Sequence, residues 1–152
     1  MKRMYPLVLD IVKQYETNNP YELCKFMNIS VVHTDSIDSY GLLIKVLNKK
    51  IILIHSDLDN NQRSVVLAHE LGHVILHKGG YHLFDIHKLS VSKQDKKEYE
   101  ANKFAFLLIA HTCLRNNPTM IDSIRSEKTL TLKDTLELLK TFSKESCFIR
   151  RE

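Results

Sequence analysis

The chain has 152 residues, of which 43% are hydrophobic and 26% are charged, and its formal net charge is +4. This length and composition are typical of one globular domain covering residues 1–152, and the scattered basic residues argue against direct nucleic-acid binding. The sequence contains neither a long apolar run nor a signal-peptide pattern, so we expect a cytoplasmic protein that makes no membrane contact.

Two helices and an extended segment are predicted in the first part of the chain. Apolar side chains at helical spacing predict a helix over residues 5–15. Asn19 and Pro20 are typical of a cap and a first helical position, so a second helix is predicted over residues 20–28. Residues 29–33 are expected to be extended.

Two β-rich runs follow, at residues 42–47 and 50–55, and the Asn48-Lys49 pair between them predicts a hairpin. The edge of the second run could accept an extended polypeptide as an added strand. Asp59 and Gln62 then have the spacing of a capping box, which predicts the start of a central helix. These elements predict an α+β fold: a small, mostly antiparallel sheet of about three strands flanked by helices.

The strongest functional signal is the H-E-x-x-H motif at residues 69–73, inside the apolar run 65–76. Residues four apart lie on one face of an α-helix, so His69 and His73 can offer two imidazole nitrogens to one metal ion. Glu70 neighbours that face and is placed to take a proton from water activated by the metal, rather than to bind the metal itself.

The residues after the motif leave the role of His77 open. His77 follows His69 by eight residues, which is about 12 Å along a helix and too far for all three histidines to share one ion. It could lie behind the ligands, face a partner or simply be exposed. Gly79-Gly80 is expected to end the helix.

Further helices are predicted in the second half of the chain. A long helix is predicted from Ser92 to about Leu114, in which the small residues Ala101 and Ala105 would allow a close approach to the central helix. Residues 132–142 predict an amphipathic helix, and residues 143–151 a short one.

A catalytic zinc ion takes three protein ligands, so the two histidines need a partner. The candidates are Glu98, Glu100, His82, Asp85 and His87. Glu100 is favoured because it shares a helical stripe with Phe104 and Leu107, which would carry it towards the core. Glu98 lies about 200° away around the helix and is expected to point elsewhere.

Three stretches resemble the ImmA/IrrE family of metallo-endopeptidases. They are N-P-Y-E-L at residues 19–23, N-Q-R at 61–63 leading into A-H-E-L-G-H at 68–73, and E-Y-E-A-N-K-F-A at 98–105. The resemblance covers roughly residues 7–108. The family commonly continues the last stretch with Leu-Leu-Met-Pro, whereas this chain has Leu-Leu-Ile-Ala. Residues 117–152 are divergent from the family and are expected to form C-terminal helices.

The resemblance implies a zincin-like core, in which the H-E-x-x-H helix faces a second, glutamate-bearing helix. It further implies a gluzincin-like site in which His69, His73 and Glu100 bind Zn²⁺ and Glu70 is the catalytic base. It also implies a cytoplasmic zinc endopeptidase, often encoded by a phage or another mobile genetic element. Its substrate would be a helix-turn-helix transcriptional repressor, and cleavage would relieve repression.

Other functions remain as alternatives. A non-proteolytic zinc-binding regulator could inactivate a repressor or another protein by stoichiometric binding, although a purely structural metal site would not need Glu70. A DNA-binding module or a closed structural zinc site is disfavoured by the scattered basic residues and the lack of Cys and His clusters. The sequence indicates neither the oligomeric state nor a choice between zinc and Mn, Fe or Co.

The candidate oxyanion-stabilising residues are Tyr40, Tyr81, His82 and Tyr99.

Overall fold

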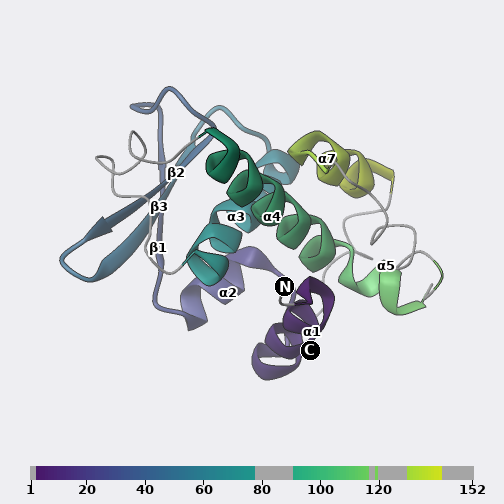
Figure 1. Ribbon diagram of the computed structural model, residues 1–152. Coiled ribbons are helices and arrows are strands. Elements are labelled where there is room, and N and C mark those ends of the chain that lie inside the picture. The colour runs from purple at the N-terminus through teal and green to yellow at the C-terminus, as the bar shows by residue number, and fades with distance from the viewer. Residues whose placement is uncertain (1–2, 78–90, 117–118, 120–129, 142–152) are drawn as a thin grey trace.

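The computed structural model describes residues 3–77, 91–116, 119 and 130–141. In this part of the chain, helices cover one face of a three-stranded sheet, which confirms the predicted α+β class (Figure 1). The elements in chain order are α1 (Met4–Tyr15), α2 (Pro20–Phe26), β1 (Ser30–Thr34), β2 (Gly41–Val46), β3 (Lys49–His55), α3 (Asn60–Leu76), α4 (Val91–Ile109), α5 (His111–Asn116) and α7 (Leu132–Thr141). No helix in the described ranges combines the length and the apolar character needed to cross a membrane.

The predicted helix starts are present. Asn19 Oδ1 accepts a hydrogen bond from the Tyr21 backbone N–H at 2.9 Å, and Pro20 is the first residue of α2. At the start of α3, Asp59 accepts from the Gln62 backbone N–H at 2.8 Å, while the Gln62 side chain accepts from the Asp59 N–H at 2.9 Å. This reciprocal capping box fixes where the central helix begins.

The predicted hairpin is confirmed, but its turn lies one residue earlier than expected. Val46 pairs with Lys49, so the turn residues are Leu47 and Asn48 rather than Asn48 and Lys49. Both turn residues have positive φ, 48° and 67° respectively. This is the backbone that a tight two-residue hairpin requires, and asparagine adopts it more easily than leucine.

The sheet is mixed rather than mostly antiparallel, because β3 lies between the other two strands. β1 runs parallel to β3, and β2 runs antiparallel to it. The expectation that β3 offers an open edge is therefore wrong: both of its edges are already paired. Among the described residues, the outer edge of β2 makes no strand pairing.

Two helices, α3 and α4, form the middle of the fold, with the sheet on one side of them and α7 on the other (Figure 1). Leu43, Ile52 and Ile54 on one face of the sheet are buried in a core shared with Leu67 and Leu71 of α3. Such a core removes apolar surface from water and holds α3 in place.

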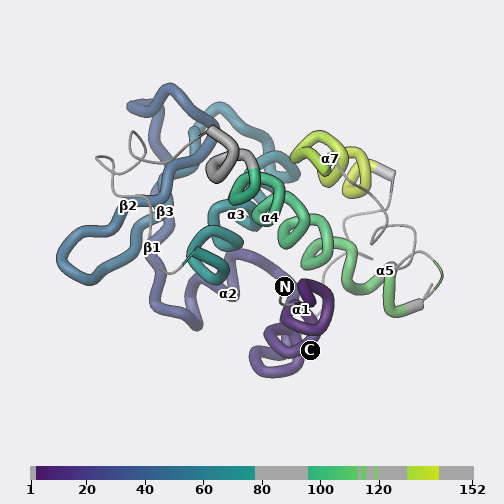
Figure 2. Tube along the Cα trace, viewed as in Figure 1, coloured from purple at the N-terminus to yellow at the C-terminus, as the bar shows by residue number. Residues whose placement is uncertain are grey.

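The helix predicted from Ser92 to about Leu114 is present as two helices, α4 and α5, with a break at Ala110. The helix predicted over residues 132–142 is α7, whereas residues 79–80 and 143–151 lie outside the described part of the chain. Figure 2 shows that the start of the chain lies beside the C-terminal end of α4. There the Asn18 side chain donates a hydrogen bond to the Leu108 carbonyl at 3.1 Å.

Candidate metal centre and active site

The central helix places the three polar residues of the H-E-x-x-H motif in a buried environment. His69, Glu70 and His73 are respectively 6%, 9% and 2% exposed. Buried polar side chains destabilise a fold unless they are paired with other groups. Their burial therefore indicates that partners from elsewhere in the fold meet them.

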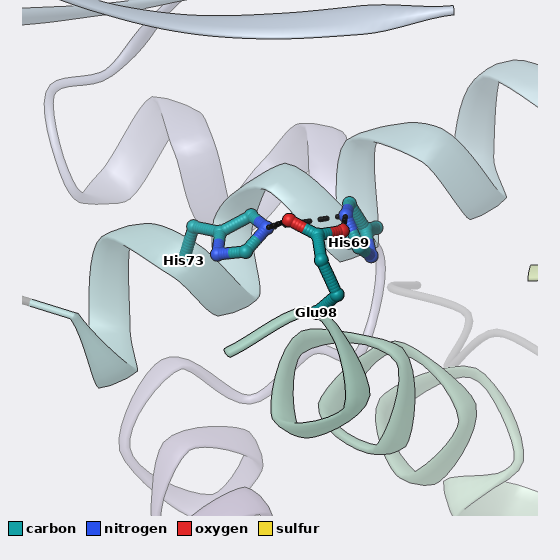
Figure 3. Close-up of side chains that lie close together, drawn as sticks. All are labelled: His69, His73 and Glu98. Atoms are coloured by element: carbon teal, nitrogen blue, oxygen red, sulfur yellow. Dashed lines mark hydrogen bonds and ion pairs between the residues drawn. The ribbon is translucent and has the colours of Figure 1, made fainter. Parts of the chain in front are cut away.

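One partner is Glu98 of α4, which faces both histidines (Figure 3). Glu98 Oε2 lies 3.1 Å from His69 Nε2, and Glu98 Oε1 lies 3.2 Å from His73 Nε2. The two Nε2 atoms are themselves 3.2 Å apart. Three side chains thus direct ligand-type atoms at one small volume between α3 and α4.

The structure corrects the predicted placement of the two glutamates on α4. Glu98 was expected to point away from the histidines, but it contacts both of them. Glu100, the predicted third ligand, instead places Oε2 3.0 Å from His77 Nε2. The two carboxylates do diverge around the helix as expected, but the face of α4 that meets the motif is the one carrying Glu98.

The physical reason for this placement is the close contact between α3 and α4. A Cβ atom at Gly72 would lie 3.2 Å from Ala101 Cα and 3.1 Å from Phe104 Cδ1, so the small residues Gly72 and Ala101 allow the two helices to approach closely. Glu98 precedes Ala101 by three residues and shares its face of α4. The small residues at positions 101 and 105 were the sequence signal for this face.

The second ring nitrogens of the two motif histidines have different surroundings. His73 Nδ1 lies 3.0 Å from His77 Nδ1. His69 Nδ1 is buried and has no hydrogen-bond partner among the described residues, and the same holds for Asn102 Oδ1. Asn102 contributes, after Glu98 and Glu70, to the raised pKa of His69, and Asn102 Nδ2 donates to the Leu130 carbonyl at 2.9 Å.

The ionisable side chains of the site change one another's pKa values. Burial alone would raise the pKa of Glu98, but hydrogen bonds with His69 and His73 hold it well below its usual range. Burial would lower the pKa of His69, yet the hydrogen bond with Glu98 and the charge of Glu70 raise it overall. Burial keeps the pKa of His73 below its ordinary value. The site therefore has an ionised carboxylate beside two imidazoles, a donor set suited to a divalent cation.

Glu70 lies beside this cluster and does not form part of it. Burial raises its pKa to about 7, while the charges of His69 and Glu98 act in opposite directions on it. A Cβ atom at Gly41, the first residue of β2, would lie 3.1 Å from Glu70 Oε1 and 2.5 Å from Val66 Cγ1. The absence of a side chain at Gly41 therefore lets the start of the edge strand β2 pass directly beside Glu70.

The spacing of the ligand-type atoms can accommodate a metal ion such as zinc, because one ligand atom from each of His69, His73 and Glu98 lies within 4.8 Å of the others. Nitrogen and oxygen ligands about 2.0–2.1 Å from a tetrahedral zinc are about 3.3–3.4 Å from each other. The two histidine Nε2 atoms are 3.2 Å apart, and each lies 3.1 to 3.2 Å from a different oxygen of Glu98, Oε2 for His69 and Oε1 for His73. A set of two imidazoles and one carboxylate also leaves a fourth position for water or substrate, as catalytic zinc sites require.

The remaining predicted site residues are the candidates for oxyanion stabilisation and the alternative third ligands. Tyr40 is 68% exposed immediately before β2, and its carbonyl accepts a hydrogen bond from the His55 backbone N–H. The Tyr99 ring on α4 lies under the Lys103 ammonium, 5.9 Å from the ring centroid. Tyr81, His82, Asp85 and His87 lie outside the described residues.

An α+β core in which an H-E-x-x-H helix faces a second, glutamate-bearing helix is compatible with the zincin-like class of metallopeptidases. Residues 24–143 match the family model of a peptidase family described as the IrrE N-terminal-like domain, and the chain belongs to this family.

Two relatives have similar sequences. The chain is 36% identical over 104 residues to metallopeptidase ImmA of Bacillus subtilis, a match that covers 67% of this chain and 60% of the relative. It is also 36% identical over 100 residues to "uncharacterized immunity region protein 2" of Bacillus phage phi105, covering 65% of this chain and 63% of the relative. The chain thus matches somewhat under two thirds of the length of each relative.

Proposed function

We propose that this protein is a zinc-dependent endopeptidase whose ion is held by His69, His73 and Glu98. The observation that carries the proposal is the convergence of their three ligand-type atoms beside the buried carboxyl group of Glu70. When bound, the zinc ion would polarise the scissile carbonyl and make water more acidic. Family membership and the name of the Bacillus subtilis relative support the same reaction class.

Glu70 would act as the general base. Its carboxylate accepts a proton from the attacking water as the water oxygen bonds to the carbonyl carbon of the peptide. The C–N bond then breaks, and Glu70 returns the proton to the leaving amine. A carboxyl group with a pKa near 7 can accept and return a proton at neutral pH.

The outer edge of β2 would hold the substrate. Gly41 brings the beginning of this strand against Glu70, and backbone groups at a sheet edge can bind an extended peptide as an added strand. An extended segment of a protein substrate would then lie across the ligand cluster. This role belongs to β2, because β3 is enclosed between two strands.

The substrate class that fits best is a helix-turn-helix repressor, so that cleavage relieves repression in the cytoplasm. The immunity-region name of the phage relative supports a role in the control of a mobile genetic element. Whether cleavage or binding inactivates the repressor can be tested with one variant.

Glu70→Gln removes the base and leaves all three proposed ligands in place. We expect it to retain zinc while peptide cleavage falls by at least about 100-fold. Wild type and Glu70→Gln should be incubated with lysate from the source cells, and new protein N-termini should be identified by mass spectrometry. A new N-terminus in a helix-turn-helix protein, made only by wild type, is the expected result. If wild type and Glu70→Gln both contain zinc and give the same set of protein N-termini, the alternative of stoichiometric binding without proteolysis would be favoured.

A further inference from the structure

We propose that Glu100 and His77 are positioning residues, which hold the His73 ring in the orientation and tautomer that leave His73 Nε2 free for the metal. The proposal rests on the metal site proposed above. It assigns a role to Glu100 and His77, which lie outside the cluster of His69, His73 and Glu98.

The three side chains form a continuous hydrogen-bonded chain. Glu100 Oε2 lies 3.0 Å from His77 Nε2, and His77 Nδ1 lies 3.0 Å from His73 Nδ1. The His77 side chain is only 8% exposed and that of Glu100 is 25% exposed. A buried imidazole with both ring nitrogens engaged has a fixed orientation, unlike an exposed histidine at a helix end.

With a metal at His73 Nε2, the protons in this chain can be assigned by elimination. An ionised carboxylate only accepts hydrogen bonds, so His77 Nε2 carries a proton and donates it to Glu100. In a neutral His77 ring, Nδ1 is then an acceptor, and the proton between the two rings belongs to His73 Nδ1. A neutral His73 with its proton on Nδ1 then has the Nε2 lone pair available to the metal. In the structure this Nε2 atom lies against the Glu98 carboxylate and His69.

The end of α3 makes this arrangement available. His77 is the C-cap residue directly after α3, and its backbone N–H donates to the His73 carbonyl at 3.0 Å. It therefore stays one turn beyond His73, above the same face of the helix. Histidines that bind metals commonly donate their second ring N–H to an oriented acceptor, and loss of that acceptor weakens metal binding. In this chain the acceptor is itself oriented by a carboxylate from α4.

The test compares Glu100→Ala, Glu100→Gln and His77→Ala with the matched control Asp10→Asn, which removes a carboxylate from the exposed side of α1. The zinc dissociation constant is measured by competition with a chromophoric chelator. We expect it to weaken by about 10- to 100-fold in Glu100→Ala and in His77→Ala. Glu100→Gln should weaken it less, because the amide oxygen can still accept from His77 Nε2. Asp10→Asn should match wild type.

¹⁵N NMR of the histidine rings in the metal-free protein distinguishes the proposed positioning role of Glu100 from a general contribution to stability. We expect His77 to be the Nε2–H tautomer in wild type, in Glu100→Gln and in Asp10→Asn, and to lose that preference in Glu100→Ala. Unchanged zinc affinity in Glu100→Ala would overturn the proposal, and so would weakened affinity with an unchanged His77 tautomer. The tautomer is measured without metal, so it can be determined whether or not the protein binds zinc. A wild-type protein that binds no zinc would refute the proposed function, whereas the tautomer of His77 would still test the hydrogen-bonded chain.

Discussion

Gly72 of α3 lies directly against Ala101 of α4, and a Cβ atom at Gly72 would come within 3.2 Å of Ala101 Cα and 3.3 Å of its carbonyl oxygen. This contact sets the distance between the helix that carries the histidines and the helix that carries Glu98.

We therefore expect Gly72→Ala to weaken zinc binding. Alanine is favoured over glycine within a helix by about 0.8–1.0 kcal/mol, but pushing a methyl group against backbone atoms costs about 1–3 kcal/mol. Zinc affinity by chelator competition and stability by urea unfolding should both fall. Unchanged zinc affinity would show that Glu98 tolerates a wider separation of the helices.

Asn102 is expected to support His69 as His77 supports His73. Asn102 Oδ1 and His69 Nδ1 are both buried without a hydrogen-bond partner among the described residues, so each could satisfy the other, and the Leu130 carbonyl accepts from the Asn102 amide group. Asn102→Ala should weaken zinc binding by about tenfold, because the His69 ring loses its acceptor. The same chelator competition measures this effect. Wild-type affinity in a folded Asn102→Ala protein would contradict the assignment.

The motif and its helix could be predicted from the sequence because they depend on local spacing. His69 and His73 follow from the four-residue repeat of a helix, and the Asp59–Gln62 capping box fixes where that helix begins. These relationships involve residues close together in the chain, so local rules determine them.

The choice between Glu98 and Glu100 could not be made with the same rules, because it depends on which face of α4 meets α3. Ala105 and Leu107 lie about 200° apart around the helix and both are buried, so burial occurs on more than one side of α4. The position of β3 between β1 and β2 could not be predicted from local rules either, because the parallel pairing of β3 with β1 joins segments that are not neighbours in the chain.

The hairpin turn offers a stabilising substitution away from the site. Leu47 has φ 48° and is 93% exposed, so it is conformationally strained and contributes no burial. Leu47→Asn should raise the free energy of unfolding by about 0.5–1 kcal/mol, because asparagine adopts positive φ more readily. Thermal unfolding provides the measurement, with Leu47→Val as the control that should destabilise. An equal or lower melting temperature for Leu47→Asn would contradict this prediction.

Cys24 should make the protein less stable at high pH. The thiol is 1% exposed, and burial raises its pKa to about 12. The unfolded chain therefore loses this proton first as the pH rises above about 8.5. The stability contribution is complete below that pH and is lost as the pH rises towards 12, by at most about 1.4 kcal/mol per pH unit.

The measurement for Cys24 is urea unfolding between pH 8 and 11 in wild type and in Cys24→Ala. The stability of wild type should fall more steeply than that of the variant, and the folded Cys24 thiol should resist alkylation at pH 8. Parallel stability curves for the two proteins would contradict the prediction.

The metal site is tested most directly by the zinc content of purified wild type, His73→Ala, Glu98→Ala and Glu100→Ala, measured by mass spectrometry after preparation without chelators. We expect about one zinc per chain in wild type, none in His73→Ala and Glu98→Ala, and one in Glu100→Ala when zinc is in excess, with weaker affinity. Full zinc in Glu98→Ala together with none in Glu100→Ala would contradict the assignment of Glu98 as the third ligand.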